Sequence, residues 1–410
     1  MRLKTEAQSA RRPFAHRLRW RDTLAAGVLL ATALSVAAGP ARASTLDGKA
    51  DLFVQRLASH GRRSGWTSVI VRVRGGLDAQ REASLRGLGA DIYRRLPIVS
   101  SAAMRIPVRN LDRLAALPFV SRISADTDVV KCDEFTVGRS GADVAFSQSS
   151  LTGLGVTVAV IDSGIKTSSD NLDLPYSSAT RLKAAVNFVP STQTEAATTI
   201  DNCGHGTHVA GIIAGNGYNS TGSNYTRTFY GIARRAGLVS VRVLNSNGQG
   251  TVSQVISGLQ WAVTNKATYN IRVINLSLGH PVGESYTTDP LCQAVESAWN
   301  AGIVVVVAAG NQGRLNPTVS ATQNNEGYGT AYGSIQSPGN DPYAITVGAT
   351  KQMDSLRQDD RITTYSSRGP SRLDLVLKPD ILAPGNKVIS VYGPSTYLAT
   401  TDPQNAVPWS

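Results

Sequence analysis

Two histidines lie in a run of small residues, Cys203 to Gly215, which reads CGHGTHVAGIIAG. The run has neither the charges of a solvated helix face nor the leucines of a large core helix, so we expect its backbone to pack closely against neighbours. A buried imidazole at the start of such a helix is costly, because burial disfavours its charged form. Such groups occur more often at functional sites than elsewhere. We interpret His205 as catalytic and His208, nearly one turn further, as a helix-packing residue.

Two further polar residues follow apolar strands. Asp162 comes directly after the run 156–161, and Asn311 lies between glycines after the run 303–308. Functional residues collect beyond the carboxyl ends of parallel strands, so Asp162, His205 and Asn311 are candidates for one edge. These three side chains suit nucleophilic acyl transfer. The carboxylate would orient the imidazole, the imidazole would move a proton, and the amide would stabilise an oxyanion. The structural alternatives are a helix cap for Asp162 and a left-handed turn for Asn311.

Strands and helices alternate along residues 132–410, and they would position these side chains. Near-continuous apolar strands separated by helices predict an α/β fold, a doubly wound parallel sheet covered on both faces. The expected strands are Val156–Ile161, Val239–Leu244, Val273–Leu276, Ile303–Ala308 and Ala344–Val347, and the expected helices are His205–Ala214, Val252–Thr264 and Pro290–Asn300.

A small α+β unit precedes this region. Val69, Val71 and Val73 alternate as in a strand, and Leu111, Leu114 and Leu117 have helical spacing. Strands are expected at 66–74, within 90–107 and at 119–130, with helices at 79–88 and 108–117. This β-α-β-β-α-β order predicts a ferredoxin-like unit.

The order Asp, His, Asn occurs in the contexts AVIDSGI, GHGTHVAGIIAG and AAGNQG, and residues 132–410 also contain INLSLG, YSSRGP and KPDILAPG. On these motifs the chain resembles the subtilisin family of serine proteases (subtilases, peptidase family S8), which are hydrolases. The resemblance covers 132–410 nearly end to end. Residues 44–131 resemble, less specifically, the inhibitory propeptide of such zymogens, and net charge and topology suggest that its last strand stays in the cleft until cleavage near Lys131.

The resemblance implies a role for each matching residue. Asp162 would orient His205, the general base, and Asn311 would donate to the oxyanion, as established for subtilisin. Two edge strands would pair with an extended peptide substrate and read mainly its backbone. These substrate-binding segments are Ser277-Leu278-Gly279 and Gly248-Gln249-Gly250.

The nucleophile is where the chain departs from the family pattern. The family places its serine in a G-T-S-M-A string after the A-P-G segment, and no G-T-S occurs in the 410 residues. We expect truncation of a longer protein rather than evolved loss, and no normal proteolytic activity for this chain alone. The alternatives are a pseudoprotease that binds peptides or inhibits a relative, and a cysteine hydrolase that uses Cys203.

Residues 1–43 have the form of a secretory signal peptide. Several arginines precede an apolar run, Leu24 to Ala38, and Ala41-Arg42-Ala43 offers a cleavage site. The apolar run is too short for a membrane span. Arg11-Arg12-Pro13-Phe14 resembles a twin-arginine signal. The sequence thus predicts secretion without a membrane anchor.

The charge distribution and the cysteine spacing limit which binding partners and metals we expect. The formal net charge is +12, but residues 1–131 account for +13 and the remainder for −1, so a nucleic-acid partner is not expected. The three cysteines, Cys132, Cys203 and Cys292, lack metal-binding spacing. We expect no metal or cofactor in the chemistry, although related proteases often bind structural calcium. The expected partners are a protein or peptide substrate and the chain's own propeptide, with the protein a monomer.

Overall fold

The computed structural model describes residues 45–60, 65–131, 140, 142–166, 180–192, 195, 197–223, 228–316, 328–351 and 360–406. The predicted signal peptide and Cys132 lie outside these residues. Within the described part of the chain, no helix has the length and apolar character needed to cross a membrane.

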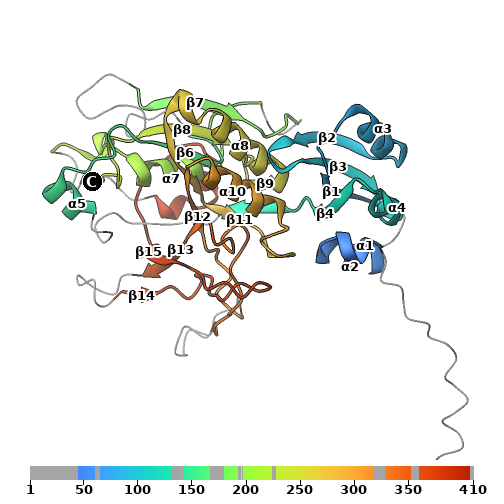
Figure 1. The fold of residues 1–410 in the computed structure, drawn as a ribbon. Coiled ribbons are helices and arrows are strands. Elements are labelled where there is room, and N and C mark those ends of the chain that lie inside the picture. The colour runs from blue at the N-terminus through green and yellow to red at the C-terminus, as the bar shows by residue number, and fades with distance from the viewer. Residues whose placement is uncertain are drawn as a thin grey trace, which may run out of the picture. The chain divides into compact units, whose positions relative to one another are not determined.

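The larger part of the chain is built on one mostly parallel sheet, in the order β14-β13-β12-β10-β6-β8-β7 with β15 beside β13 (Figure 1). All described pairs in it are parallel except β13 with β14. This confirms the predicted α/β architecture. The strands are β6 (Thr157–Asp162), β7 (Leu182–Asn187), β8 (Gly237–Arg242), β10 (Ile271–Leu276), β12 (Val304–Ala308), β13 (Ile345–Lys351), β14 (Arg361–Ile362) and β15 (Ile381–Pro384).

Helices cover both faces of this sheet, as alternation along β6 shows. Ala159 and Ile161 join the core that contains α8 (Val252–Thr264) and α10 (Pro290–Asn300). Val158 and Val160 pack in a separate core with α7 (His205–Ala214). Successive side chains of a strand point to opposite faces, so the two cores lie on opposite sides of the sheet. The short helices of this region are α5 (Ala142–Ser149), α9 (Lys266–Tyr269) and α11 (Tyr397–Thr401).

The three long helices have the predicted bounds, and a local feature marks the start of each. Thr251 and Gln254 form a reciprocal capping box at α8. Asp289 accepts from the first backbone N–H groups of α10, and Pro290 occupies the first helical position. Gly204 precedes α7 with φ of 98°, a conformation that favours glycine.

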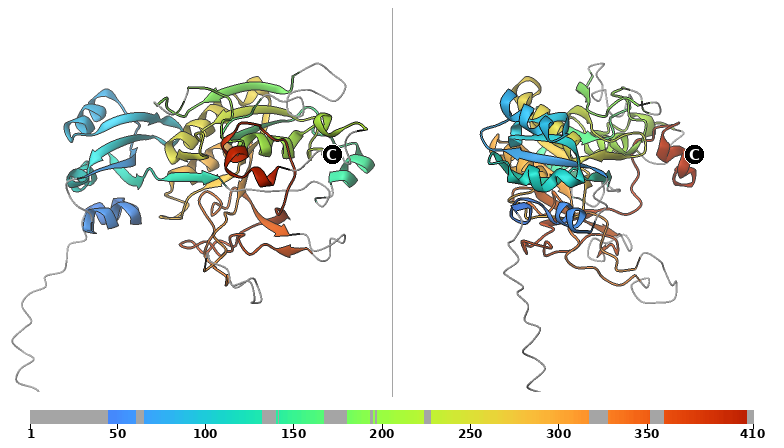
Figure 2. Two further views of the ribbon diagram at one scale, coloured as in Figure 1. Left: turned by 180° about the vertical axis from the view of Figure 1, so that it is seen from behind. Right: turned by 90° about the vertical axis from the view of Figure 1, so that its right-hand side faces the viewer.

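The N-terminal subdomain, residues 45–131, contains an antiparallel sheet in the order β2-β3-β1-β4 around its own apolar core. With α3 and α4 this gives the predicted ferredoxin-like order of elements, to which α1 and α2 are added in front. Its sheet side contacts α8 and α10 through β2 and the short helical turn at Pro97–Val99 (Figures 1 and 2). The bounds are α1 (Thr45–Lys49), α2 (Leu52–His60), β1 (Trp66–Val73), α3 (Ala79–Gly87), β2 (Asp91–Leu96), β3 (Ser101–Pro107), α4 (Leu111–Ala116) and β4 (Val120–Ala125).

A third, three-stranded sheet joins the two regions. Its order is β11 (Leu278–Gly279), β5 (Asp128–Lys131) and β9 (Gln249–Thr251). The last strand of the N-terminal subdomain therefore lies between two strands of the larger region.

Candidate active site

Asp162 and His205 are in direct contact. Asp162 is the last residue of β6, and His205 is the first residue of α7. His205 Nδ1 lies 2.7 Å from Asp162 Oδ1, and the side chains are 2% and 0% exposed. An ionised carboxylate only accepts, so this contact places the proton of a neutral imidazole on Nδ1 and makes Nε2 the ring's acceptor. The pair therefore has the geometry of an oriented general base.

A second buried carboxylate, Asp201, holds the start of α7. Its Oδ1 accepts from the backbone N–H of Cys203 at 3.0 Å, from that of Gly204 at 2.8 Å and from the Ser163 hydroxyl at 2.8 Å. Its Oδ2 accepts from the N–H and the hydroxyl of Thr207. An anion at a helix N-terminus is favourable, and here it also fixes the turn that carries His205. We did not predict Asp201, although an Asp just before the small-residue run was a signal for it.

The small residues of α7 allow the close packing that the sequence predicts. A Cβ atom on Gly206 would lie 2.2 Å from the carbonyl oxygen of Gly164, and one on Gly211 would lie 2.3 Å from Ser390 Oγ. His208 lies further along α7, and its carbonyl accepts from the Ser390 hydroxyl at 2.6 Å. The helix start thus sits directly against the segment that follows Asp162.

Asn311 lies at the same end of the sheet but does not touch the pair. It follows β12, and β12, β10 and β6 are consecutive parallel strands. Its side chain is exposed. The neighbouring Gly310 has φ of 104° and accepts from the Ser367 N–H at 2.9 Å, which anchors the turn. The structure therefore brings Asp162 and His205 together and leaves Asn311 open to solvent at their edge.

The two predicted substrate-binding segments flank β5. Leu278 and Gly279 pair antiparallel with Lys131 and Val130, while Gln249 and Gly250 pair antiparallel with Val130 and Val129. Both glycines are needed for close packing, because a Cβ atom would lie 2.4 Å from Val243 O at Gly250 and 2.9 Å from Ser337 O at Gly279. Gly248 turns the chain into β9 with φ of 74°, and Ser277, just before β11, accepts from the Asn275 side chain at 3.0 Å. The two edges thus hold an extended strand between them.

A buried ion pair ties this region together. Arg242 is fully buried at the end of β8 and donates to Glu195 and, at 2.8 Å, to the carbonyl of Thr198. Glu195 also accepts from the Ser246 N–H at 2.9 Å. Burial raises the pKa of Glu195, but the hydrogen bonds from Ser246 and Arg242 outweigh it, so the pKa is lowered. The pair links the loop before Asp201 to the turn before β9, and its members are too far apart in sequence to have been predicted as partners.

The described cysteines have core positions. Cys203 and Cys292 are both fully buried, and neither is in a disulfide. Burial raises the pKa of the Cys292 thiol well above its ordinary value, and nearby Asp289 and Asp341 add to the effect. A thiol held in its neutral form is a poor nucleophile. For Cys203, the residue of the cysteine-hydrolase alternative, full burial favours the core interpretation.

The parallel α/β sheet and the Asp162–His205 pair agree with the expected resemblance to serine proteases, and comparison with known proteins names the family. The chain belongs to the Subtilase family (peptidase S8), whose model matches residues 153–407.

Its similar relatives are bacterial proteases. It is 35% identical to serine protease AprX of Bacillus subtilis (strain 168) over 276 residues, which is 65% of this chain and 54% of AprX. It is 33% identical to an alkaline protease of Shouchella clausii over 319 residues, or 77% and 67% of the two chains. It is 31% identical to subtilisin E of Bacillus subtilis (strain 168) over 333 residues, or 80% and 73%. The chain thus spans little more than half the length of AprX.

Proposed function

We propose that this protein is a secreted serine endopeptidase precursor that cleaves peptide bonds by Asp-His-Ser acyl transfer. The observation that carries the proposal is the 2.7 Å contact between His205 Nδ1 and Asp162 Oδ1 in a subtilase fold. The 410 residues contain no G-T-S string, so the nucleophile is not among them. We accordingly expect these residues alone to lack normal proteolytic activity.

The proposed chemistry assigns one role to each of three side chains. Nε2 of His205 would take the proton of the serine hydroxyl as it attacks the scissile carbonyl, and would return it to the leaving amine. Asp162 would stabilise the imidazolium formed in between. The amide of Asn311 would donate to the oxyanion, a contribution of about 10²–10³ in kcat as known for subtilisin. No cofactor is needed for these steps, and calcium would be only structural.

Substrate binding is proposed for the edges Ser277–Gly279 and Gly248–Gly250. The antiparallel pairing of β5 between β11 and β9 supports this, because an extended peptide could occupy the same place. Ladder hydrogen bonds to a peptide backbone give affinity with little sequence preference. Residues 44–131 would then be an inhibitory propeptide, 132–410 the peptidase domain and 1–43 the signal peptide. We propose a monomer with peptide substrates, no nucleic-acid partner and no membrane anchor.

A second function, that of a pseudoprotease which binds peptides or inhibits a relative, has one observation in its favour. The chain contains the edge strands but no family nucleophile motif.

Hydrolysis by the complete gene product separates the two functions. We expect the secreted protein to cleave casein and a chromogenic peptide, and to be labelled by a fluorophosphonate at a serine. The His205→Ala variant should lose both activities while remaining folded. A complete gene product that folds but neither hydrolyses nor becomes labelled would contradict the endopeptidase and favour the pseudoprotease.

A further inference from the structure

The loop between β11 and α10, residues 280–289, contacts the N-terminal subdomain through residues separate from strand β5. Gly283 O accepts from the Leu52 N–H at 3.3 Å, and Glu284 Oε2 accepts from Arg122 Nε at 2.8 Å. A Cβ atom on Gly283 would lie 2.1 Å from the ring of Phe53, so the ring packs directly on the loop backbone. This loop is therefore shaped to fit the start of α2 and strand β4.

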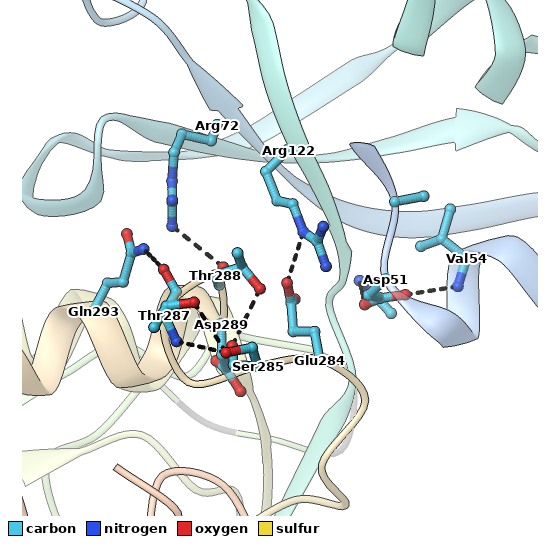
Figure 3. Close-up of polar contacts among 12 residues, drawn as sticks. Asp51, Val54, Arg72, Arg122, Glu284, Ser285, Thr287, Thr288, Asp289 and Gln293 are labelled. Carbon is cyan, nitrogen blue, oxygen red and sulfur yellow. Dashed lines mark hydrogen bonds and ion pairs between the residues drawn. The ribbon is translucent and has the colours of Figure 1, made fainter. Parts of the chain in front are cut away.

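Arginines of two strands reach toward the same loop, as Figure 3 shows. Arg72 of β1 donates to the carbonyl of Thr288 at 3.4 Å, and Arg122 of β4 donates to Glu284. Both arginines belong to the N-terminal subdomain, whereas the residues that accept their hydrogen bonds belong to the larger region. The contact is thus polar and charged, unlike the apolar packing of the cores.

Buried carboxylates outnumber the arginines at this contact. Asp51, Glu284 and Asp289 are 4%, 5% and 2% exposed, and they face Arg72 and Arg122. Glu296 of α10 adds a partly buried fourth carboxylate near Arg72. If all were ionised, the contact would enclose uncompensated negative charge, which is costly away from water. Separation of the two surfaces would relieve it.

Asp51 and Asp289 already accept several hydrogen bonds. Asp51 accepts from the N–H groups of Val54 and Ala125, at 2.7 and 2.6 Å. Asp289 caps α10 and accepts from the Ser337 hydroxyl at 2.7 Å. Glu284, by contrast, accepts from the side chain of Arg122 at 2.8 Å.

The electrostatics give the direction of the pH effect. Burial, with the charge of Asp289, raises the pKa of Glu284 to about 7, and Arg122 only partly opposes this. Burial also raises the pKa of Asp51. A carboxyl whose pKa is raised by docking binds its proton more tightly in the docked form, so docking is strongest at low pH and weakens as pH rises through 7. His280 also lies at this contact, with Nε2 3.8 Å from Asp289 Oδ2.

We propose that residues 280–289 form a further docking site for the propeptide, beside β5 and the contact of β2 and Pro97–Val99 with α8 and α10, and that this site holds the propeptide at acidic pH and loosens as the pH rises through neutrality. This inference rests on the proposed role of residues 44–131 as the propeptide. It adds to that role a condition, the pH, under which the propeptide would be released.

Hydrogen exchange of the 410-residue chain tests the proposal without using peptidase activity, so a failure of the proposed enzyme function would not affect the result. Exchange is measured by mass spectrometry at pH 6 and pH 9 and corrected for the chemical exchange rate at each pH. We expect peptides covering 45–60 and 280–289 to lose protection by about tenfold or more at pH 9. Peptides of the core strand β10 (Ile271–Leu276) should keep theirs.

Matched variants test whether Glu284 causes the pH-dependent loss of protection. Glu284→Gln removes the titrating group, so its pH-dependent loss of protection should shrink to less than about twofold. Asp112→Asn, an exposed change on α4, should leave the tenfold response intact. Asp51→Asn serves as a second interior variant if Glu284→Gln does not fold, and it should also reduce the response. Equal protection of the wild-type chain at both pH values, or a full response in Glu284→Gln, would overturn the proposal.

Discussion

Oδ2 of Asp201 accepts hydrogen bonds from both the backbone N–H and the hydroxyl of Thr207, at 2.8 and 2.7 Å. Together with the bonds to Oδ1, this carboxylate satisfies most of the donors around the first turn of α7. The position of His205 therefore depends on a residue that takes no part in the proposed chemistry.

Asp201→Asn should lower the free energy of unfolding. An amide cannot accept at both of its atoms, so one side of the network would face a donor instead of an acceptor. Because hydrogen bonds to buried charged groups contribute strongly, we expect a loss of about 2–4 kcal/mol. Urea denaturation of the 410-residue chain measures it, with Asp112→Asn as the exposed control. A loss no larger than that of the control would contradict the network's role.

Gly206→Ala should be far more damaging than an alanine substitution at another helical glycine. The new Cβ atom would lie 2.2 Å from the carbonyl oxygen of Gly164, a backbone atom that cannot move aside as the end of a flexible side chain could. We expect a loss of about 3 kcal/mol or more, or failure to fold. Gly87→Ala at the end of α3 meets no atom within 4 Å and should be neutral or stabilising by up to about 1 kcal/mol. Thermal unfolding compares the two, and equal unfolding temperatures would refute the packing argument.

Processing of the secreted protein should leave an N-terminus near Cys132. Strand β5 ends at Lys131, between the two proposed substrate-binding edges, so the proposed cleavage near Lys131 would fall at the end of this strand. Edman sequencing of the mature secreted protein identifies the cut. A mature N-terminus far from Cys132 would argue against β5 as the propeptide's last strand.

The thiol of Cys203 should be dispensable for hydrolysis. Its side chain is fully buried in the turn before His205, where it fills core space. Cys203→Ala in the complete gene product should keep kcat/KM within about threefold of wild type, since small volume changes are tolerated best. Peptide hydrolysis measures this. A loss of activity with unchanged folding would instead revive the cysteine hydrolase.

The sequence predicts elements well where local signals agree with tertiary packing. The helix His205–Ala214 has the predicted bounds because a left-handed glycine and a run of small residues both mark its start. Strand β7 was not predicted, since Leu182–Asn187 is the terminal strand of its sheet and only partly buried, and such a strand needs little apolar sequence.

The residues of the site also differ in how well the sequence predicts them. Asp162 and His205 could be predicted because each ends or begins an element with a strong pattern. The ion pairs Arg242–Glu195 and Arg122–Glu284 could not be predicted from the sequence. Their members are 47 and 162 positions apart in the chain, respectively. Contacts of this kind arise from the assembled fold, and a local pattern carries no information about them.

The tautomer of His205 tests the central claim, that Asp162 orients this imidazole as a general base. Nitrogen-15 NMR of the histidine rings in the 410-residue chain at pH 8 reports which nitrogen carries the proton. We predict that His205 is protonated at Nδ1, with Nε2 as the acceptor, and that Asp162→Asn abolishes this preference. A wild-type His205 protonated at Nε2 would contradict the account.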